Sequence, residues 1–197
     1  MISQKRIKEL SKLRGRVRGD VIITDFKYIR DRQGKQAMDK LNQELKKVNK
    51  DLDYYKIKNT VWLPVSWKVL LLENAKKTFK WKDKDFFDLG HSASSNSFIT
   101  RTLLRYFVSV NKTFKESAKY WQKYWQVGEL DPYYLDVKKK YLILRLKKFK
   151  LHPDLCPYMK GHFLAFAEMI LRNDNINIEE TKCNFRGDSF HEFKIQW

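Results

Sequence analysis

The sequence has few residues that crosslink or interrupt a chain: two cysteines, four prolines and seven glycines among 197 residues. Two cysteines are too few for the disulfide framework of a small secreted scaffold. Apolar runs are short, as at residues 69–72 and 141–144, so no membrane-spanning helix is predicted. The charged N-terminus has no apolar run behind it and does not resemble a signal peptide, so a cytoplasmic location is expected.

Motifs of several enzyme classes are missing as well. The sequence contains no Gly-x4-Gly-Lys-Ser/Thr phosphate loop, no dinucleotide fingerprint, no Gly-x-Ser-x-Gly elbow and no His-Glu-x-x-His pair. No helix-turn-helix is evident either. We therefore predict no catalytic residue and expect a binding protein rather than an enzyme.

Apolar and positively charged side chains are abundant. Hydrophobic residues make up 43% and aromatic residues 15%, which is typical of a globular protein, and we expect one domain over residues 1–197. Lys and Arg number 41 against 23 Asp and Glu, which gives a net charge of +18. This balance favours nucleic acid or an anionic membrane as a partner, although lysine-rich faces are more often simply solvated.

Basic residues are densest in residues 1–18, where Glu9 is the only acid. Apolar residues recur through this segment at roughly helical spacing, at Ile7, Leu10, Leu13 and Val17. One interpretation is a basic amphipathic helix that binds a membrane or nucleic acid. The other is an N-terminal helix that packs on its own domain or on a partner, with its charges in water.

Hydrophobic periodicity divides the chain into a helical first part and a mixed last third. Helices are predicted at about residues 20–31, 37–48, 66–77 and 98–110, and from a capping box at residues 113–116 to near residue 128. Residues 59–64 should be extended, and residues 90–96 should form a loop or a helix entry. The last third predicts strands at 133–137 and 141–149, a helix at 155–170 and a hairpin of 176–183 with 189–197.

The predicted fold class is α+β. An N-terminal helical layer packs on a small antiparallel sheet of about four strands, with one helix between the two C-terminal hairpins.

Four possible metal ligands lie near the C-terminus: Cys156, Glu180, Cys183 and His191. Thiolate, imidazole and carboxylate ligands suit a structural Zn²⁺. If residues 186–188 form a three-residue hairpin loop, Cys183 lies opposite His191, with Cβ atoms about 4.5–5.5 Å apart. Glu180 would point to the other face of a regular strand, so it joins the set only if the strand bends or bulges.

The same residues have other interpretations. Cys156 and Cys183 are also consistent with small buried core residues, or with a disulfide. In the first case His191 would be a hydrogen-bonded core histidine and Glu180 would be solvated. Further residues nearby that could replace one member of the set are His152, Asp154 and His162.

This order of elements and motifs resembles the 4-vinyl-reductase domain family. The resemblance rests on a Cys-x4-Gly helix start followed by a Glu-x-x-Cys hairpin, with the residues Cys156, Gly161, Glu180, Cys183, Gly187, Asp188 and His191. Residues 17–22, Tyr28 and Gly34 are also similar to the N-terminal part of that family. The likeness covers nearly the whole chain, but the specific motifs lie in its last quarter. The family belongs to a fold group with haem-nitric-oxide sensor domains and TRAPP-type vesicle-transport subunits, which generally enclose a hydrophobic cavity.

The resemblance implies a sensor-like receptor for a small hydrophobic or aromatic ligand. In the aromatic-sensing activators of the family, cysteines and a glutamate hold a structural zinc, and Cys156, Glu180 and Cys183 correspond to them. His191 stands where a further cysteine is usual, and histidine is a competent zinc ligand. Output would pass through a homodimer or a partner. The alternatives are a scaffold subunit and a basic nucleic-acid or membrane-surface protein, with enzymatic activity suggested only by the family's reductase name.

An apolar cavity with few polar contacts is expected for such a ligand. His91 is a candidate for a ligand contact or a haem iron, with a surface or capping role as the alternative. The haem-sensor relatives need a proximal histidine and a Tyr-x-Ser-x-Arg pattern; that pattern is missing, so no haem is expected. The predicted ligand-binding residues are His91, Phe98, Tyr106, Phe107, Trp121, Trp125 and Tyr134.

Overall fold

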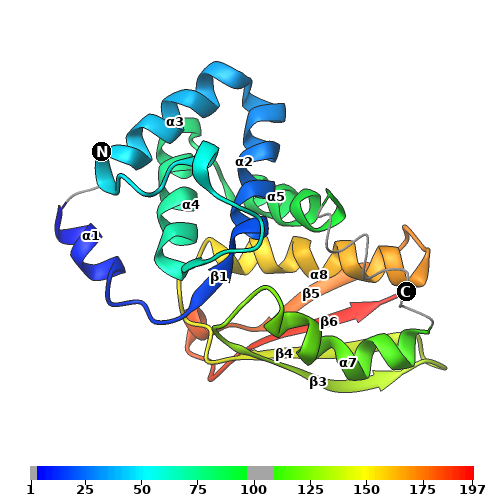
Figure 1. Cartoon of the computed structure of the whole chain (residues 1–197). Helices are drawn as coiled ribbons and strands as arrows, with labels where there is room; N and C mark the ends of the chain where they lie inside the picture. The colour runs from blue at the N-terminus through cyan, green and yellow to red at the C-terminus, as the bar shows by residue number, and fades with distance from the viewer. Residues whose placement is uncertain (1–3, 97–108) are drawn as a thin grey trace.

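The computed structural model describes residues 4–96 and 109–197, which form a helical layer above a four-stranded sheet (Figure 1). The helical layer contains α1 (Gln4–Leu10), α2 (Gly19–Gln33), α3 (Lys35–Val48), α4 (Val65–Phe79) and α5 (Asp83–Asn96). The short strands β1 (Arg16–Arg18) and β2 (Trp62–Pro64) pair antiparallel beside it, and a 3-10 turn, η1, covers Tyr54–Lys56.

The C-terminal part carries the larger sheet and two long helices. Its elements are α7 (Val110–Gln122), β3 (Glu129–Asp136), β4 (Tyr141–Lys147), α8 (Leu155–Leu171), β5 (Asn177–Lys182), the 3-10 turn η2 (Asn184–Arg186) and β6 (His191–Gln196). The strand order is β3-β4-β6-β5, and every neighbouring pair is antiparallel. The predicted α+β class is confirmed, with α8 between the two hairpins. The β1–β2 pair was not predicted.

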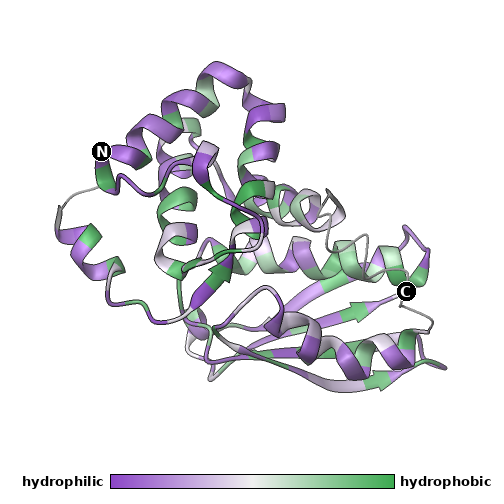
Figure 2. Cartoon of the chain, viewed as in Figure 1, coloured by the Kyte–Doolittle hydropathy of each residue, from purple (hydrophilic) through white to green (hydrophobic). Residues whose placement is uncertain are grey.

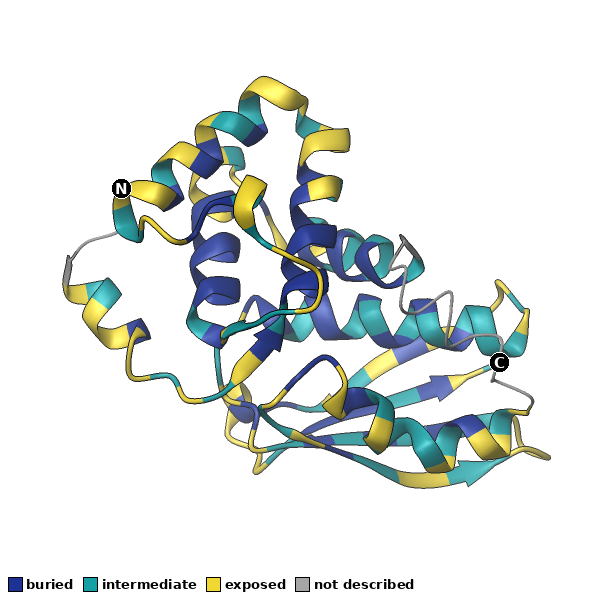
Figure 3. Cartoon of the chain, viewed as in Figure 1, coloured by how far each residue is buried: buried dark blue, intermediate teal, exposed yellow. Residues whose placement is uncertain are grey.

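The core of the helical layer is built around α4, which buries the apolar run Val69–Leu72 together with polar residues such as Lys68 and Glu73. Most of its residues from Val65 to Ala75 are buried, and Figure 3 shows the helix as nearly continuous dark blue. By contrast α3 buries only one stripe, including Met38, Leu41 and Leu45, and Figure 2 shows its polar face in purple.

The small polar stretch at residues 90–96 is the second half of a helix, so the prediction of a loop or a helix entry there is wrong. α5 continues to Asn96 and packs closely against α8. A Cβ atom at Gly90 would lie 2.0 Å from the carbonyl oxygen of Tyr158, and one at Gly161 would lie 2.1 Å from that of Phe87. Small residues here allow two helix backbones to touch.

Helix α7 begins earlier than predicted. Ser109 is its N-cap and its hydroxyl accepts a hydrogen bond from the amide of Lys112 at 3.2 Å, so the capping box at residues 113–116 is not used. Most of the helix predicted at residues 98–110 lies outside the described residues. Among the helices that the structure describes, none is both long and apolar enough to cross a membrane.

The basic N-terminal helix docks on the helical layer. Leu10 is buried, and Arg6 of α1 donates to Glu73 of α4, with 2.9 Å from Nε to Oε1. His152 also approaches Glu73, with Nε2 3.2 Å from Oε1. Residues in this segment therefore pack on their own chain, which is one of the two interpretations of the sequence.

The Glu73 network predicts a loss of stability in acid. Burial by itself would raise the pKa of Glu73, but hydrogen bonds from His152 and Arg6 lower that pKa from 4.5 to about 2. A depressed carboxyl pKa stabilises the fold above pH 4.5, and the contribution disappears as the pH falls toward 2. We expect Glu73→Gln to remove up to about 3 kcal/mol of unfolding free energy at pH 7 and much less at pH 2.

The measurement is denaturant unfolding of both proteins across this pH range. The matched control is Glu9→Gln, because Glu9 also bonds Arg6, at 3.0 Å, but has a largely exposed side chain. A constant stability difference between wild type and Glu73→Gln from pH 7 to pH 2 would contradict the network's role.

Candidate metal centre and ligand cavity

The structure brings together the four residues of the predicted metal set. One ligand atom each from Cys156, Glu180, Cys183 and His191 lie within 4.8 Å of one another. Cys156 lies in the first turn of α8, while the other three come from the final hairpin. The set thus joins α8 to both strands of that hairpin.

A bulge in β5 explains how Glu180 reaches the other ligands. The register changes between Glu180, which pairs with Phe193, and Lys182, which pairs with Glu192. The extra residue, Thr181, resets the alternation of side chains across the sheet. Glu180 Oε1 consequently lies 2.9 Å from His191 Nδ1.

The predicted three-residue hairpin loop is wrong, although Cys183 still lies near His191. The connection contains η2, which ends at Gly187 with φ of 101°, a conformation that favours glycine. Asp188 holds the loop closed: its Oδ2 accepts from the Cys183 amide at 2.7 Å, and its amide donates to the Cys183 carbonyl at 3.2 Å. These bonds fix the backbone that carries Cys183.

Contacts with residues outside the set orient two of the possible ligands, His191 and Glu180. His191 Nε2 lies 3.3 Å from the carbonyl oxygen of Phe149, which can only accept, so Nε2 can donate there while Nδ1 faces the set, 2.9 Å from Glu180 Oε1. Metal-binding histidines commonly donate their other N–H in this way. Arg186 Nη2 lies 3.7 Å from Glu180 Oε2 and bonds the Glu180 carbonyl at 2.9 Å.

The spacing of the donor atoms suits a tetrahedral ion. The two sulfurs are 3.5 Å apart, and Cys156 Sγ lies 3.9 Å from His191 Nδ1. Zn–S bonds of about 2.3 Å in a tetrahedron place two sulfurs roughly 3.8 Å apart. Burial raises the pKa of the Cys156 thiol, and the negative charge of Glu180 raises it further. A cation among the four would favour the thiolate forms.

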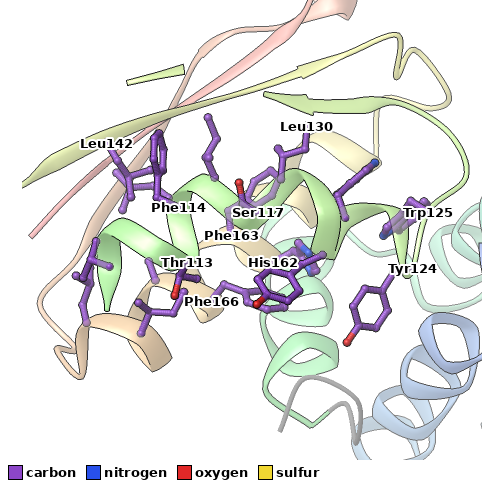
Figure 4. A pocket seen from close by; sticks show the side chains of 18 residues that line it. Thr113, Phe114, Ser117, Tyr124, Trp125, Leu130, Leu142, His162, Phe163 and Phe166 are labelled. Carbon is purple, nitrogen blue, oxygen red and sulfur yellow. The ribbon is translucent and has the colours of Figure 1, made fainter. Parts of the chain in front are cut away.

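An apolar cavity of about 100 Å³ lies between α7, α8 and the inner face of the sheet (Figure 4). Helix α7 contributes Thr113, Phe114 and Ser117, and α8 contributes His162 and Phe166. The sheet closes the cavity with leucine and isoleucine side chains, at Leu130, Leu142, Leu144 and Ile195. A dry cavity of about 150 Å³ binds benzene in another protein, so this space suits a ligand of a few heavy atoms.

His162 is the polar centre of this cavity and of a smaller space of about 20 Å³ beside it. The hydroxyl of Ser94 donates to the Gly90 carbonyl at 2.9 Å, so its oxygen accepts from His162 Nδ1, 2.5 Å away. Burial, with the charge of Lys68 as a second cause, lowers the pKa of His162 to about 3. The ring is therefore neutral and protonated at Nδ1, which leaves Nε2 as a hydrogen-bond acceptor or a metal ligand.

The predicted ligand-binding residues are only partly brought together. Trp121 and Trp125 line the cavity and stack with 5.4 Å between ring centroids. His91 instead bonds Glu168 of α8, with 2.6 Å from Nε2 to Oε2. Tyr134 follows a bulge in β3, is 41% exposed and stacks on Tyr141 at 5.3 Å. The remaining three, Phe98, Tyr106 and Phe107, lie outside the described residues.

Sequence reasoning missed His162 and Phe166 as cavity residues. Both lie on the apolar stripe of α8, which is typical of ordinary core. His162 follows Gly161, whose close contact with α5 sets the ring beside Ser94, but this requires knowledge of the helix crossing. His152 and Asp154 do not replace a metal ligand, since they contact each other and His152 contacts Glu73.

Solved structures share this fold. An H-NOX protein from S. oneidensis in the Fe(II)NO ligation state aligns with TM-score 0.63 and 13% identity, covering 91% of this chain and 98% of that one. An oxygen-binding H-NOX domain related to soluble guanylate cyclases gives TM-score 0.64 and 12% identity, with 91% and 94% covered. No protein-family model and no curated protein matches the sequence. The fold group expected from the sequence is thus supported at the level of fold, whereas the 4-vinyl-reductase family is not shown.

The expectation that no haem is involved is contradicted by these comparisons. A third structure, with TM-score 0.62 and 11% identity over 91% of this chain and 99% of that one, concerns haem redox potential and porphyrin distortion. The neighbours with this fold are therefore haem proteins.

Proposed function

We propose that this chain is a single sensor-like unit that binds a small molecule in the cavity between α7 and α8. The observation that carries the proposal is an apolar cavity with one oriented, neutral imidazole in its wall. Such a combination of apolar lining and a few polar groups is typical of ligand sites. A ligand that enters or leaves the cavity would change the contacts of α7. The resulting signal would pass to a partner protein or to a second copy of this chain.

The chemistry of the wall selects the ligand class. The body of the ligand should be small and apolar, because the cavity holds about 100 Å³ and is lined mainly by aromatic and aliphatic side chains. Its polar group should be a hydrogen-bond donor, because His162 Nε2 can only accept. A small aromatic alcohol satisfies both conditions.

Paired probes test this selection. We expect phenol to bind more tightly than benzene, because only phenol donates to His162. Replacing His162 with Phe should remove the difference, which we expect to be roughly 5- to 100-fold in Kd, the range for one buried hydrogen bond. Isothermal titration calorimetry of both probes to both proteins gives the four constants.

A second variant separates cavity from acceptor. Ala167→Leu narrows the same cavity from α8 without touching His162, and should weaken both probes together. Equal binding of phenol and benzene to wild type would contradict the role of His162. Binding of neither would contradict the proposed function.

Haem binding is a second candidate, favoured by the haem proteins that share this fold. His162 offers a neutral imidazole with an unprotonated Nε2, the form that ligates haem iron. A volume of about 100 Å³ is below the roughly 300–1,000 Å³ of pockets for larger ligands, so the porphyrin does not fit the cavity as described and the walls would have to move.

Reconstitution with haemin decides between the candidates. A Soret band in wild type that shifts or disappears in His162→Phe would support haem held by His162. A haemin complex with the same spectrum in both proteins would place the iron elsewhere. If wild type takes up no haemin but binds phenol selectively, the result would support the small-molecule function.

We also propose that Cys156, Glu180, Cys183 and His191 hold Zn²⁺ as a structural ion. The donor types, the 3.5 Å sulfur separation and the contact of His191 Nε2 with the Phe149 carbonyl support this assignment. The ion would fix the final hairpin to the start of α8, and α8 carries His162 two turns later. Metal would then stabilise one wall of the cavity without contacting the ligand.

A further inference from the structure

The outward face of α7 carries a row of lysines. Lys112, Lys115, Lys119 and Lys123 are all exposed and are spaced by three or four residues, so they share one side of the helix. At 1.5 Å per residue the row spans about 17 Å. We call these four residues the α7 lysine stripe.

The stripe is not neutralised by neighbouring acids. Within residues 4–96 and 109–197, no ion pair involves any of its four lysines. Glu116 is the acid on the same helix, and its carboxylate accepts from the Tyr120 hydroxyl at 2.9 Å. Nearby Lys147 and Lys148 differ, because Asp131 and Glu129 pair with them at 2.7 Å and 2.6 Å.

A second group of lysines extends the charge beyond the helix. Lys138, Lys139 and Lys140 form the exposed turn between β3 and β4. Helix α7 packs along β3, and its N-terminal end lies at the same end of the sheet as this turn (Figures 1 and 2).

We propose that the α7 lysine stripe and the lysine turn bind single-stranded nucleic acid. Lysines in a continuous row contact successive phosphates and release counterions. A membrane is the weaker match, because the apolar residues of α7, such as Phe114 and Trp121, face the cavity. No apolar face then remains on this helix to enter a bilayer.

Helix α7 joins this surface to the ligand cavity. Thr113 and Ser117 line the cavity, while Lys112, Lys115 and Lys119 of the same helix face solvent. A molecule in the cavity and a nucleic acid on the stripe would therefore contact opposite faces of one helix. This coupling rests on the proposed function, whereas nucleic-acid binding by the stripe does not.

Fluorescence anisotropy with a labelled single-stranded DNA of about 20 nucleotides tests the surface without any cavity ligand. The variant is Lys112→Glu/Lys115→Glu/Lys119→Glu. We expect its affinity to fall at least about tenfold at low salt, and the slope of log K against log salt to lessen by about 2, from three lost phosphate contacts. Circular dichroism checks that the variant is folded, which is expected because all three side chains are exposed.

Two charge-matched controls make the result specific. Lys35→Glu/Lys40→Glu/Lys50→Glu changes exposed lysines on and after α3, and Lys5→Glu/Lys8→Glu/Lys12→Glu changes the N-terminal segment. Both should lose less than about threefold, since long-range charge effects are screened. An equal loss in either control would overturn the stripe as the site. Failure of wild type to bind DNA would also overturn the proposal. Binding of wild type to anionic phosphatidylserine vesicles but not to DNA would overturn it in the same way.

Discussion

Replacing Cys183 with Ser is expected to abolish zinc binding and to lower the Tm by roughly 8–16 °C. A ligand present at about 1,000 times its Kd stabilises the folded state by about 4 kcal/mol. For a chain of this size, each kcal/mol corresponds to about 2–4 °C in Tm. Serine is a poor zinc ligand, so the variant should lose most of this contribution. Elemental analysis and differential scanning calorimetry on protein purified without chelator provide the two readouts.

Chelation and a ligand-retaining variant control this result. Treatment of wild type with EDTA should lower its Tm to that of Cys183→Ser, whose own Tm should not respond to EDTA. His191→Cys should keep one zinc per chain, because Zn²⁺ accepts either ligand in structural sites. Identical metal content and Tm in wild type and Cys183→Ser would show that the cysteines are only core residues.

The long elements could be predicted because their apolar residues repeat over several turns. The helices α2, α3, α4 and α8 and the strands β3 to β6 fall within a few residues of the predicted ranges. The predictions fail where one local sequence pattern is compatible with two structures. Gly90 with its small polar neighbours normally marks a loop, but here it permits contact of α5 with Tyr158 of α8. Residues 113–116 fit a capping box, yet Ser109 caps α7 instead.

In the candidate sites, too, some features could be predicted from the sequence and others could not. The metal set could be predicted from ligand types and spacing, and the need for a bulge beside Glu180 followed from strand alternation. The cavity could not be predicted in detail, because its polar group depends on a contact between helices. Ser94 lies 68 residues before His162 in the chain, and nothing in the sequence pairs them. Tyr134 was predicted as a polar contact in the cavity, but after the bulge in β3 it points to the other face of the sheet.

A buried ion pair connects the helical layer to α8. Asp25 of α2 and Lys68 of α4 are both 0% exposed, and Lys68 Nζ bonds Asp25 Oδ2. Tyr158 of α8 donates to Asp25 Oδ1 at 3.2 Å, and its ring lies 3.6 Å from Lys68 Nζ. Burial lowers the pKa of Lys68 to about 8 and raises the pKa of Asp25. Both shifts favour the neutral forms, so desolvation outweighs the mutual attraction of the charges.

Lys68→Met is therefore expected to destabilise the protein by about 3–5 kcal/mol, because the buried Asp25 loses its cation and must either stay charged in the core or take up a proton. The corresponding fall in Tm is roughly 6–20 °C. Denaturant unfolding at pH 7 measures the loss. Lys160→Met is a suitable control, since Lys160 lies on α8 but is only half-buried and has no ion pair among the described residues.

The double variant Asp25→Asn/Lys68→Met separates the cost of an unpaired charge from the value of the pair. The new amide oxygen would still accept from Tyr158, and the methionine side chain would fill most of the lysine volume. Replacing a buried pair by neutral groups is often neutral or stabilising, so we expect the double variant to recover most of the stability lost in Lys68→Met. If the double variant is as unstable as the single one, the pair itself holds α2, α4 and α8 together. Recovery would instead mean that the apolar packing of these helices holds them together.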